Sequence, residues 1–270
     1  MNNLLARIIT AVIGVSILIA AIVYNYWTFA LVFFAIMFLS LLEFFQLTRK
    51  SGKRPFTAWG LVVGTLLFAL IFLQAKTGVE RHYFLLLPAT ISFLFILALF
   101  RKKKDLIVTN ISFSVFGTIY VSLPLSLMSS IAFIHGEYHH GLVLGILFSQ
   151  WAADTGAYFA GKALGKHKLY ESISPNKTWE GTIGGFLLSL VVAYVFSLYF
   201  PSLSTVEWLG LGAIISIFGT MGDLVESFFK RALAIKDSGT ILPGHGGFLD
   251  RFDGLLLSLP FATLYIYLVI

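Results

Sequence analysis

Long apolar runs separated by short polar segments follow one another along the whole chain. A helix that crosses a lipid bilayer needs about 20 predominantly apolar residues, and these runs are close to that length. The pattern therefore predicts an all-α, polytopic membrane protein with about nine transmembrane helices. The expected helices cover residues 4–24, 26–47, 56–75, 83–100, 111–135, 141–160, 181–200, 206–229 and 252–270.

Composition supports this assignment. Hydrophobic residues make up 58% of the 270 positions and charged residues 12%, whereas soluble domains contain about 45–50% apolar and about 25% charged residues. The 27 Phe and the shortage of charge exclude a disordered chain. The chain has no Cys, which excludes disulfides, thiolate metal sites and Cys nucleophiles, so any metal must bind oxygen or imidazole ligands.

The first run begins like a secretory signal, because Arg7 precedes an apolar stretch. That stretch is long and leads directly into the next run without a convincing small-residue cleavage site. We therefore expect a retained helix.

The basic residues indicate how the chain is oriented. Lys and Arg concentrate in the cytoplasmic loops of membrane proteins. With nine spans, all of the 19 basic residues except Lys76 and Arg81 fall on one side. This predicts a cytoplasmic N-terminus and a C-terminus outside. Anionic lipid headgroups then account for the net charge of +6 without nucleic acid.

The polar content changes near residue 140. Before this point the runs are almost purely apolar, with Glu43 as the main intramembrane acid, whereas polar residues enter both helices and loops from Ser149 onward. We therefore expect residues 1–140 to anchor the protein and to offer dimer contacts. Residues 141–270 are expected to form the catalytic region, with its active site on the cytoplasmic side.

One face of the eighth expected helix carries polar and ionisable groups. Asp223, Glu226, Ser227 and Lys230 are spaced i, i+3, i+4 and i+7, which places them on one helical face. Ionisable groups at membrane depth are costly and usually face an interior cavity. The alternative is an intrahelical ion pair that only neutralises itself, but Asp223 lies deeper than a headgroup pair requires.

A glycine-rich loop follows this helix. It contains Pro243-Gly244-His245-Gly246-Gly247 and leads to Asp250 and Asp253 at the start of the last expected helix. Consecutive glycines let backbone N–H groups converge on an anion. The two aspartates can share one helical face and hold a divalent cation that bridges to phosphate oxygens. A Gly-Gly turn or a lone histidine indicates little alone, but the combination with nearby basic residues indicates phosphoryl or nucleotidyl transfer.

Two further polar clusters belong to the same side of the membrane. Asp154 lies about a turn and a half from the cytoplasmic end of the sixth expected helix, where a buried acid is a functional candidate. Before the seventh helix, Pro175 interrupts regular structure, Thr178 can cap the helix and Glu180 can lie at its positive end. The alternative for Thr178 and Glu180 is this purely structural capping role. Lys177 has no such role and is the better phosphate ligand.

These segments resemble the phosphatidate cytidylyltransferases, also called CDP-diacylglycerol synthases. The longest match is the pattern Ser227-x-x-Lys230-Arg231-x4-Lys236-Asp237-x-Gly239-x3-Pro243-Gly244-His245-Gly246-Gly247-x-x-Asp250-Arg251-x-Asp253, which shows no departure from the family signature. The segment Ser174-Pro175-x-Lys177-Thr178-x-Glu180-Gly181 and the surroundings of Asp154 are also similar. The close resemblance covers residues 149–254, whereas the first half matches only as a set of membrane helices.

The resemblance implies a nucleotidyltransferase of phospholipid biosynthesis that converts CTP and phosphatidate into CDP-diacylglycerol and pyrophosphate with Mg²⁺. It also implies a multi-pass protein of the cytoplasmic (inner) membrane and a homodimer. The residues are compatible with this chemistry. A phosphate monoester carries about −1.5 to −2 charges near pH 7, so phosphatidate needs little help from a general base, and charge neutralisation and alignment should dominate.

Under this hypothesis the polar residues receive expected roles around a polar cavity between the sixth, eighth and ninth helices. Asp223 and Asp250 are the expected magnesium ligands, with Asp253 and Asp154 as additional ligands. The expected catalytic residues are Asp223, Asp250, Asp253, Lys230 and Arg251. The residues expected to bind the triphosphate and the lipid phosphate are Lys177, Asn176, Ser227, Arg231, Lys236, His245, Gly246 and Gly247.

Other functions fit part of the pattern. A CTP-dependent lipid kinase of the polyprenol type would use the same nucleotide on a lipid alcohol and would release CDP. An ion-coupled transporter would also need intramembrane acids, but the polar groups concentrate on one side of the membrane and no inverted repeat is detectable. A CDP-alcohol phosphotransferase fits less well, because the chain has no Asp-Gly-x2-Ala-Arg run followed by spaced acids.

Overall fold

The computed structural model describes residues 3–102, 105–233 and 247–270, with side chains described from residue 11 onward except at 135. This part of the chain is almost entirely helical, which confirms the predicted all-α class. It divides into two compact units. The first comprises residues 1–137 and 233–251, and the second comprises residues 138–232 and 252–270.

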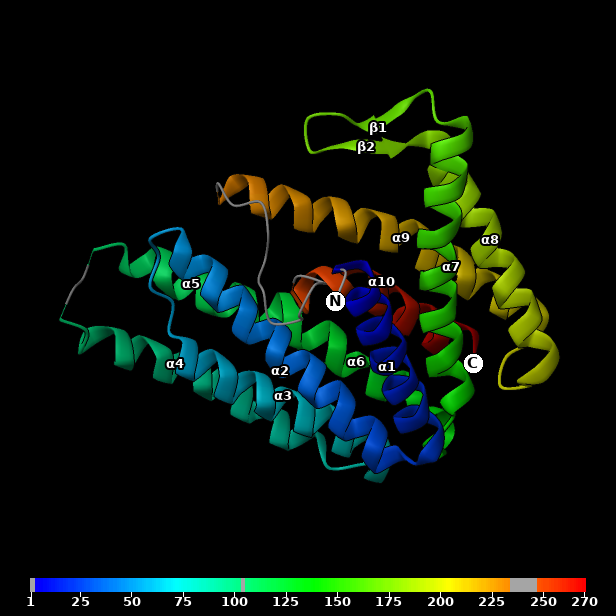
Figure 1. Ribbon diagram of the computed structural model, residues 1–270. Coiled ribbons are helices and arrows are strands. Elements are labelled where there is room, and N and C mark those ends of the chain that lie inside the picture. Colours follow the sequence, from blue (N-terminus) through cyan, green and yellow to red (C-terminus); the bar gives the residue numbers. More distant parts are fainter. Residues whose placement is uncertain (1–2, 103–104, 234–246) are drawn as a thin grey trace. The chain divides into compact units, whose positions relative to one another are not determined.

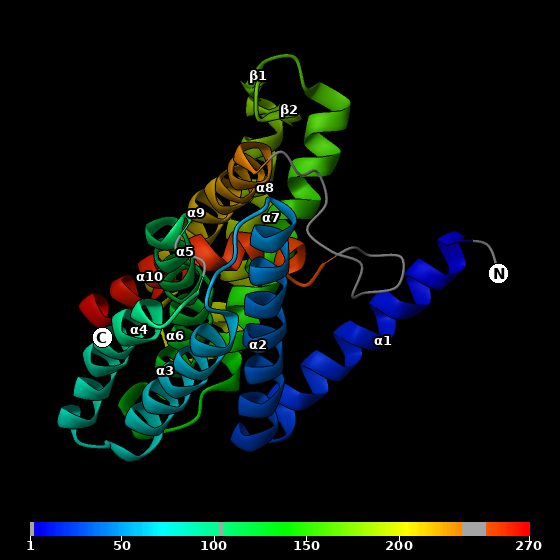
Figure 2. The same ribbon diagram turned by 90° about the vertical axis from the view of Figure 1, so that its left-hand side faces the viewer.

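The first unit is built from successive helices (Figure 1). Its elements are α1 (Asn3–Tyr24), α2 (Tyr26–Lys50), α3 (Thr57–Thr77), η1 (Arg81–Leu85), α4 (Leu86–Leu99), α5 (Ile107–Gly117), η2 (Thr118–Ser122), α6 (Leu123–Ala132) and η3 (Ile134–Gly136). Asn25, between α1 and α2, is the N-cap of α2. Its side-chain oxygen accepts hydrogen bonds from the N–H groups of Trp27 (2.8 Å) and Thr28 (2.9 Å). From this junction α1 leans away from α2 (Figure 2).

Aromatic and small residues fill the interior of this unit. Phe29, Phe33 and Phe45 of α2 are fully buried. A Cβ atom added at Gly64 of α3 would lie 2.5 Å from the hydroxyl oxygen of Ser122, so the close approach requires glycine. Membrane helices associate through such small-residue contacts, because lipid tails are as apolar as the helix side chains and supply no hydrophobic driving force.

The second unit combines long helices with one short β-hairpin. Its elements are α7 (His140–Leu164), β1 (Lys168–Tyr170), β2 (Ser174–Thr178), α8 (Trp179–Tyr199), α9 (Thr205–Ala232) and the part of α10 (Leu249–Val269) from Phe252 onward. α7 and α8 approach through glycines. A Cβ atom at Gly156 would lie 2.7 Å from the carbonyl oxygen of Gly184, so the two backbones lie in direct contact.

The hairpin is a feature that the apolar pattern does not predict. β1 and β2 are antiparallel, with Lys168 opposite Thr178 and Tyr170 opposite Ser174. Pro175 lies within β2, where the sequence indicated only an interruption of regular structure. A two-stranded hairpin tolerates proline because each strand has a free edge.

Seven helical segments of the described chain are long and apolar enough to cross a membrane. They cover residues 26–50, 57–77, 81–99, 107–132, 179–199, 205–232 and 249–269. The shorter apolar segment Ala11–Tyr24 belongs to α1, and α7, with 25 residues, is not among the seven. Each expected range thus falls on helical structure, while the total of nine spans and the sides of the termini stay predictions.

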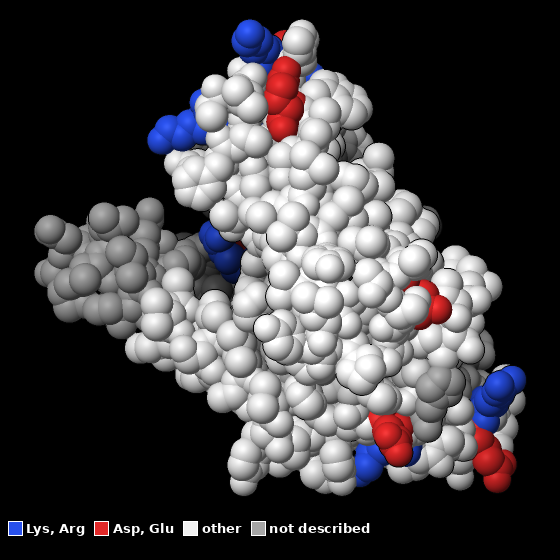
Figure 3. Space-filling view, turned by 90° about the vertical axis from the view of Figure 1, so that its right-hand side faces the viewer, with Lys and Arg blue, Asp and Glu red and all other residues white. Residues whose placement is uncertain are grey.

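Large apolar side chains face outward from these helices. On α8, Ile183, Leu187, Val191 and Leu198 are all exposed. Figure 3 shows a broad, mostly uncharged surface. So much exposed apolar surface is unfavourable in water and is expected where lipid is the solvent. The chain is a multi-pass membrane protein.

Candidate active site

An ion pair between the hairpin and α9 forms the centre of the candidate site. The Nζ atom of Lys177, on β2, lies 2.6 Å from Oδ2 of Asp223 and also donates a longer hydrogen bond to the carbonyl oxygen of Thr220 (3.4 Å). The Lys177 and Asp223 side chains are 26% and 30% exposed. Both charges therefore stay accessible to an incoming anion or cation.

A second acid lies beside Asp223. Asp253, in the first turns of α10, is within electrostatic range of Asp223 and Glu226 and within hydrogen-bonding reach of Asp223. The crossing of the two helices explains this proximity, because a Cβ atom at Gly222 would lie 2.6 Å from the carbonyl oxygen of Asp253. Two acids that the sequence placed on separate helices are thus brought together by the fold.

The predicted polar face of α9 is helical, but its members have different partners. The Nζ atom of Lys230 lies 2.9 Å from Oε2 of Glu226, one turn earlier. This is the intrahelical ion pair that the sequence left as an alternative, and it involves Glu226 instead of Asp223. Ser227 is partly exposed and Arg231 is exposed on the last turn.

Asp154 of α7 approaches the same charged groups. It lies within electrostatic range of Asp223 and Lys177, and its Oδ1 atom accepts a hydrogen bond from Nε2 of Gln150 (3.2 Å). The expected distance of this residue from the helix end was wrong, because α7 continues to Leu164, which places Asp154 about three turns from that end. The helix continues after the apolar run has ended.

Gln150 is a polar contact that the sequence reasoning missed. A Cβ atom at Gly254 of α10 would lie 2.6 Å from its Nε2 atom, and Gly219 of α9 also packs against its amide. Its Oε1 atom is buried and has no hydrogen-bond partner among the described residues. A polar residue in the middle of an apolar helix was the available signal.

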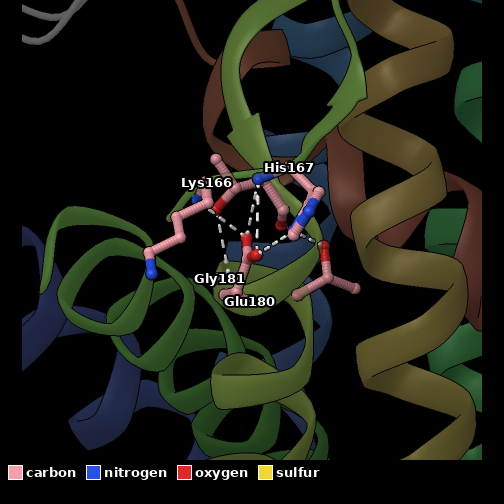
Figure 4. A network of polar contacts seen from close by, with 6 residues as sticks. Lys166, His167, Glu180 and Gly181 are labelled. Atoms are coloured by element: carbon pink, nitrogen blue, oxygen red, sulfur yellow. Dashed lines mark hydrogen bonds and ion pairs between the residues drawn. The ribbon is translucent and has the colours of Figure 1, made fainter. Parts of the chain in front are cut away.

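The start of α8 is fixed by a network of polar contacts (Figure 4). The Thr178 hydroxyl oxygen accepts a hydrogen bond from the N–H of Gly181 (3.2 Å), which confirms the expected cap. The Glu180 carboxylate accepts hydrogen bonds from the N–H groups of Lys166 (3.1 Å) and His167 and contacts the His167 ring at 2.6 Å. Thr178 and Glu180 therefore hold the hairpin on the helix end, and Lys177 lies one residue before this anchor.

The segment before α10 belongs to the first unit, where it meets Glu43. The side chain of Glu43 is fully buried in α2, and its Oε2 atom accepts a hydrogen bond from the N–H of Leu249 (2.9 Å). Asp250 is partly exposed and Arg251 is exposed just after this contact, and Gly247 is buried before it. The sequence singled out Glu43 as an intramembrane acid but assigned it no partner.

Four more residues were expected to bind substrate, namely Asn176, Lys236, His245 and Gly246. Asn176 is exposed on β2 beside Lys177. Lys236, His245 and Gly246 lie outside the described residues, so their expected roles in substrate binding stay predictions.

The donor set decides which cation fits the site. The described residues contain no group of three or more His, Asp or Glu side chains placed to hold an ion. The neighbouring carboxylates of Asp223 and Asp253 still suit Mg²⁺, because this ion usually takes one or two protein carboxylates and completes its shell with water and substrate phosphates. The metal and the ligand roles of Asp154 and Asp250 stay predictions.

Comparison with known proteins identifies the class. The chain matches the model of the cytidylyltransferase family over residues 5–269. It belongs to this family, whose members are nucleotidyltransferases. The charged groups contributed by β2, α9 and α10 are consistent with handling of a nucleotide triphosphate.

Three relatives within this similarity carry the same name, phosphatidate cytidylyltransferase. A phosphatidate cytidylyltransferase of Bacillus subtilis is 31% identical over 268 residues, which cover 97% of both chains. One of Haemophilus influenzae is 32% identical over 289 aligned residues, which cover 98% of this chain and 99% of the relative. One of Staphylococcus aureus is 57% identical over 112 residues, a match that spans 41% of this chain and 43% of that relative.

Proposed function

We propose that this protein is a phosphatidate cytidylyltransferase, which transfers the cytidylyl group of CTP to phosphatidate in phospholipid biosynthesis. The observation that carries the proposal is the cluster of Lys177, Asp223 and Asp253, contributed by β2, α9 and α10. Membership in the cytidylyltransferase family supports the nucleotide, and the names of the two relatives that match over almost their whole length support the lipid acceptor.

In the proposed reaction, a phosphate oxygen of phosphatidate forms a bond to the α-phosphorus of CTP. The bond from this phosphorus to the oxygen that bridges to the β-phosphate breaks, and its electron pair leaves with pyrophosphate. The attacking phosphate monoester is already ionised, since its second pKa is about 6. The protein therefore has to align two anions and compensate for their charge.

Lys177 is the described basic residue best placed for this task. Its ammonium group is 2.6 Å from Asp223 and partly exposed, so a phosphate oxygen can compete with the carboxylate for it. Arg231 adds a positive charge on the last turn of α9, next to Lys230, which is paired with Glu226. We expect these groups to contact the triphosphate and the lipid phosphate through charge-assisted hydrogen bonds.

The proposal includes Mg²⁺, held by Asp223 and Asp253, with Asp250 and Asp154 as further ligands. When bound, the ion would neutralise part of the triphosphate charge and hold its oxygens in place. We expect a chelator to abolish turnover without unfolding the protein, and added Mg²⁺ to restore it. Full turnover in excess chelator would exclude the metal.

We further propose that the enzyme acts as a homodimer in the cytoplasmic membrane, with the cluster on the cytoplasmic side. The distribution of Lys and Arg among the loops supports this orientation. Accessibility of cysteines introduced at exposed Asn176 and at Gly78, on the turn after α3, tests it. We expect Asn176→Cys to be labelled only from the cytoplasmic side and Gly78→Cys only from the outside. Labelling from the opposite sides would overturn the proposed orientation.

Product analysis tests the proposed activity. The purified protein in detergent is given phosphatidate, Mg²⁺ and CTP labelled at the α-phosphate. Movement of the label into a lipid with release of pyrophosphate is the expected result. Label that remains in CDP when a lipid alcohol is supplied would indicate a lipid kinase, and no consumption of CTP with any acceptor would favour the transporter.

A further inference from the structure

A hollow at one end of the first unit is lined mainly by basic residues. Its volume is about 420 Å³. The loop between α2 and α3 and the residue that follows α4 by two positions meet there, at the same end of the unit in Figure 1. The lining residues are Arg49, Gly52, Lys53, Arg54, Pro55 and Arg101. Four of them are basic and none is acidic.

The walls of this basic hollow are held in place by specific contacts. The N–H of Arg54 donates a hydrogen bond to Oδ1 of Asn110 (2.7 Å), and the N–H of Phe56 donates one to the Ser114 hydroxyl (2.7 Å). These bonds tie the α2–α3 loop to α5. The Arg101 guanidinium lies 4.4 Å from the centre of the Phe56 ring. The backbone of the loop and the Arg101 side chain are therefore held in place, which lowers the entropic cost of binding a ligand.

The charges in the hollow lack an anionic partner within the described chain. None of the four basic lining residues forms an ion pair with a described acid. The Nη1 atom of Arg101 is buried and has no hydrogen-bond partner among the described residues. Burial, together with the charges of Arg54 and Arg49, lowers the pKa of Arg101. Because this buried N–H group lacks an acceptor and the neighbouring arginines repel the Arg101 guanidinium, an anion in the hollow would supply an acceptor and offset the repulsion.

The orientation signal of a membrane protein does not account for the hollow. That signal depends on how many basic residues lie on one side and does not require them to converge. Lys50 and Lys102 carry the same charge next to the same loops, and both are exposed like Arg49 and Arg54, but neither lines the hollow. The two lysines therefore provide a natural control for the converging arginines.

The surroundings of the hollow favour a lipid as its occupant. Phe95, Leu99 and Phe100, which precede Arg101, are 54%, 72% and 82% exposed. An apolar surface thus leads directly to the basic hollow at the end of a membrane-length helix. We propose that the hollow binds the phosphate group of an anionic phospholipid, with Arg49, Arg54 and Arg101 donating charge-assisted hydrogen bonds to its oxygens. None of these residues belongs to the proposed active site, so the inference does not rest on the proposed function.

Native mass spectrometry of the full-length protein tests this proposal. The lipid probe is phosphatidylglycerol, whose phosphodiester lacks the terminal phosphate that an acceptor needs, and phosphatidylcholine is the neutral comparison. We expect the exposed pair Arg49→Gln and Arg54→Gln to lower the affinity for phosphatidylglycerol about tenfold. The matched pair Lys50→Gln and Lys102→Gln removes the same charge and should change the affinity less than about twofold.

A second variant and a competition arm make the result decisive. Arg101→Lys keeps the charge but loses the planar fork, so it should also weaken binding while its thermal unfolding matches the parent protein. Equal loss in both paired variants would mean diffuse surface charge, and no loss in any variant would mean no site; either result overturns the proposal. Displacement of the lipid by an equal concentration of inorganic phosphate would assign the hollow to free phosphate and would also overturn it.

Discussion

At the residue scale, Asp223 is paired with Lys177, which lies 46 positions earlier in the chain. A carboxylate on a membrane helix is costly unless it is paired or faces water. Lys177 supplies the pairing, and the partial exposure of both side chains supplies the access. A paired but accessible acid is suited to exchange its ammonium partner for a bound cation.

Replacement of Asp223 tests this role. Asp223→Asn keeps the size of the side chain and an acceptor for Lys177 but removes the negative charge that would hold Mg²⁺. We expect kcat to fall on the order of 100-fold, measured as release of pyrophosphate at saturating CTP and over a range of Mg²⁺. The control is Glu171→Gln, because Glu171 is an exposed acid on the hairpin turn. Turnover near that of the control would remove Asp223 from the metal site.

Lys177 gives a separate prediction. Lys177→Ala removes a charge-assisted contact to phosphate and should raise the KM for a phosphate-bearing substrate about tenfold or more. Steady-state kinetics with each substrate varied in turn measures this effect. Lys166→Ala, which removes an exposed lysine at the foot of the same hairpin, should leave both KM values close to those of the parent. Unchanged kinetics in Lys177→Ala would make it an ordinary membrane-surface lysine.

At the scale of elements, glycines decide which helices can meet. A Cβ atom at Gly185 of α8 would overlap the carbonyl oxygen of Ala153 on α7, one residue before Asp154. A Cβ atom at Gly222 of α9 would collide with the backbone of α10 next to Asp253. The acids of the candidate site therefore depend on close backbone contacts, which packing against lipid alone would not produce.

Substitution of Gly185 tests this dependence. Gly185→Val should separate α7 from α8 and destabilise the protein by about 1–3 kcal/mol, seen as a lower midpoint of thermal unfolding in detergent. The control is Gly14→Val on α1, because a Cβ atom there meets nothing within 4 Å. Equal unfolding midpoints for both variants would contradict the proposed packing.

At the scale of the whole molecule, the start of α10 is fixed by a residue 206 positions earlier. The buried Glu43 carboxylate accepts the N–H of Leu249, one of the first backbone groups of α10, which have no partner within the helix. The contact therefore acts as a long-range cap directly before Asp250. It joins α2 to the segment that carries expected catalytic residues.

Variants of Glu43 separate capping from charge. Glu43→Ala leaves the N–H of Leu249 without its acceptor and should reduce the free energy of unfolding by about 1–3 kcal/mol. Glu43→Gln keeps a carbonyl acceptor and should retain most of the stability. Hydrogen exchange at residues 249–251 measures the local effect and should be faster in the alanine variant. Equal exchange in Glu43→Ala and the parent would show that this bond does not hold the start of α10.

The sequence by itself determined the class of the protein and the region of its chemistry. In lipid, a single apolar run of about 20 residues can satisfy its backbone N–H and C=O groups within itself only as a helix. The helical fold was therefore predictable from hydropathy. The spacing of Asp223 to Lys230 predicted a helical face correctly, because that spacing is local. The resemblance in the second half of the chain indicated a cytidylyltransferase, and the family comparison confirms it.

Only the tertiary structure decided which of these groups meet. The Lys177–Asp223 pair, the approach of Asp253 and the bond from Leu249 to Glu43 join residues far apart in sequence. Hydropathy carries no information about such pairs, because every apolar helix satisfies its own backbone and can pack against several neighbours. It also missed the hairpin and the true end of α7, because polar segments fold through turn and capping contacts that have no apolar period.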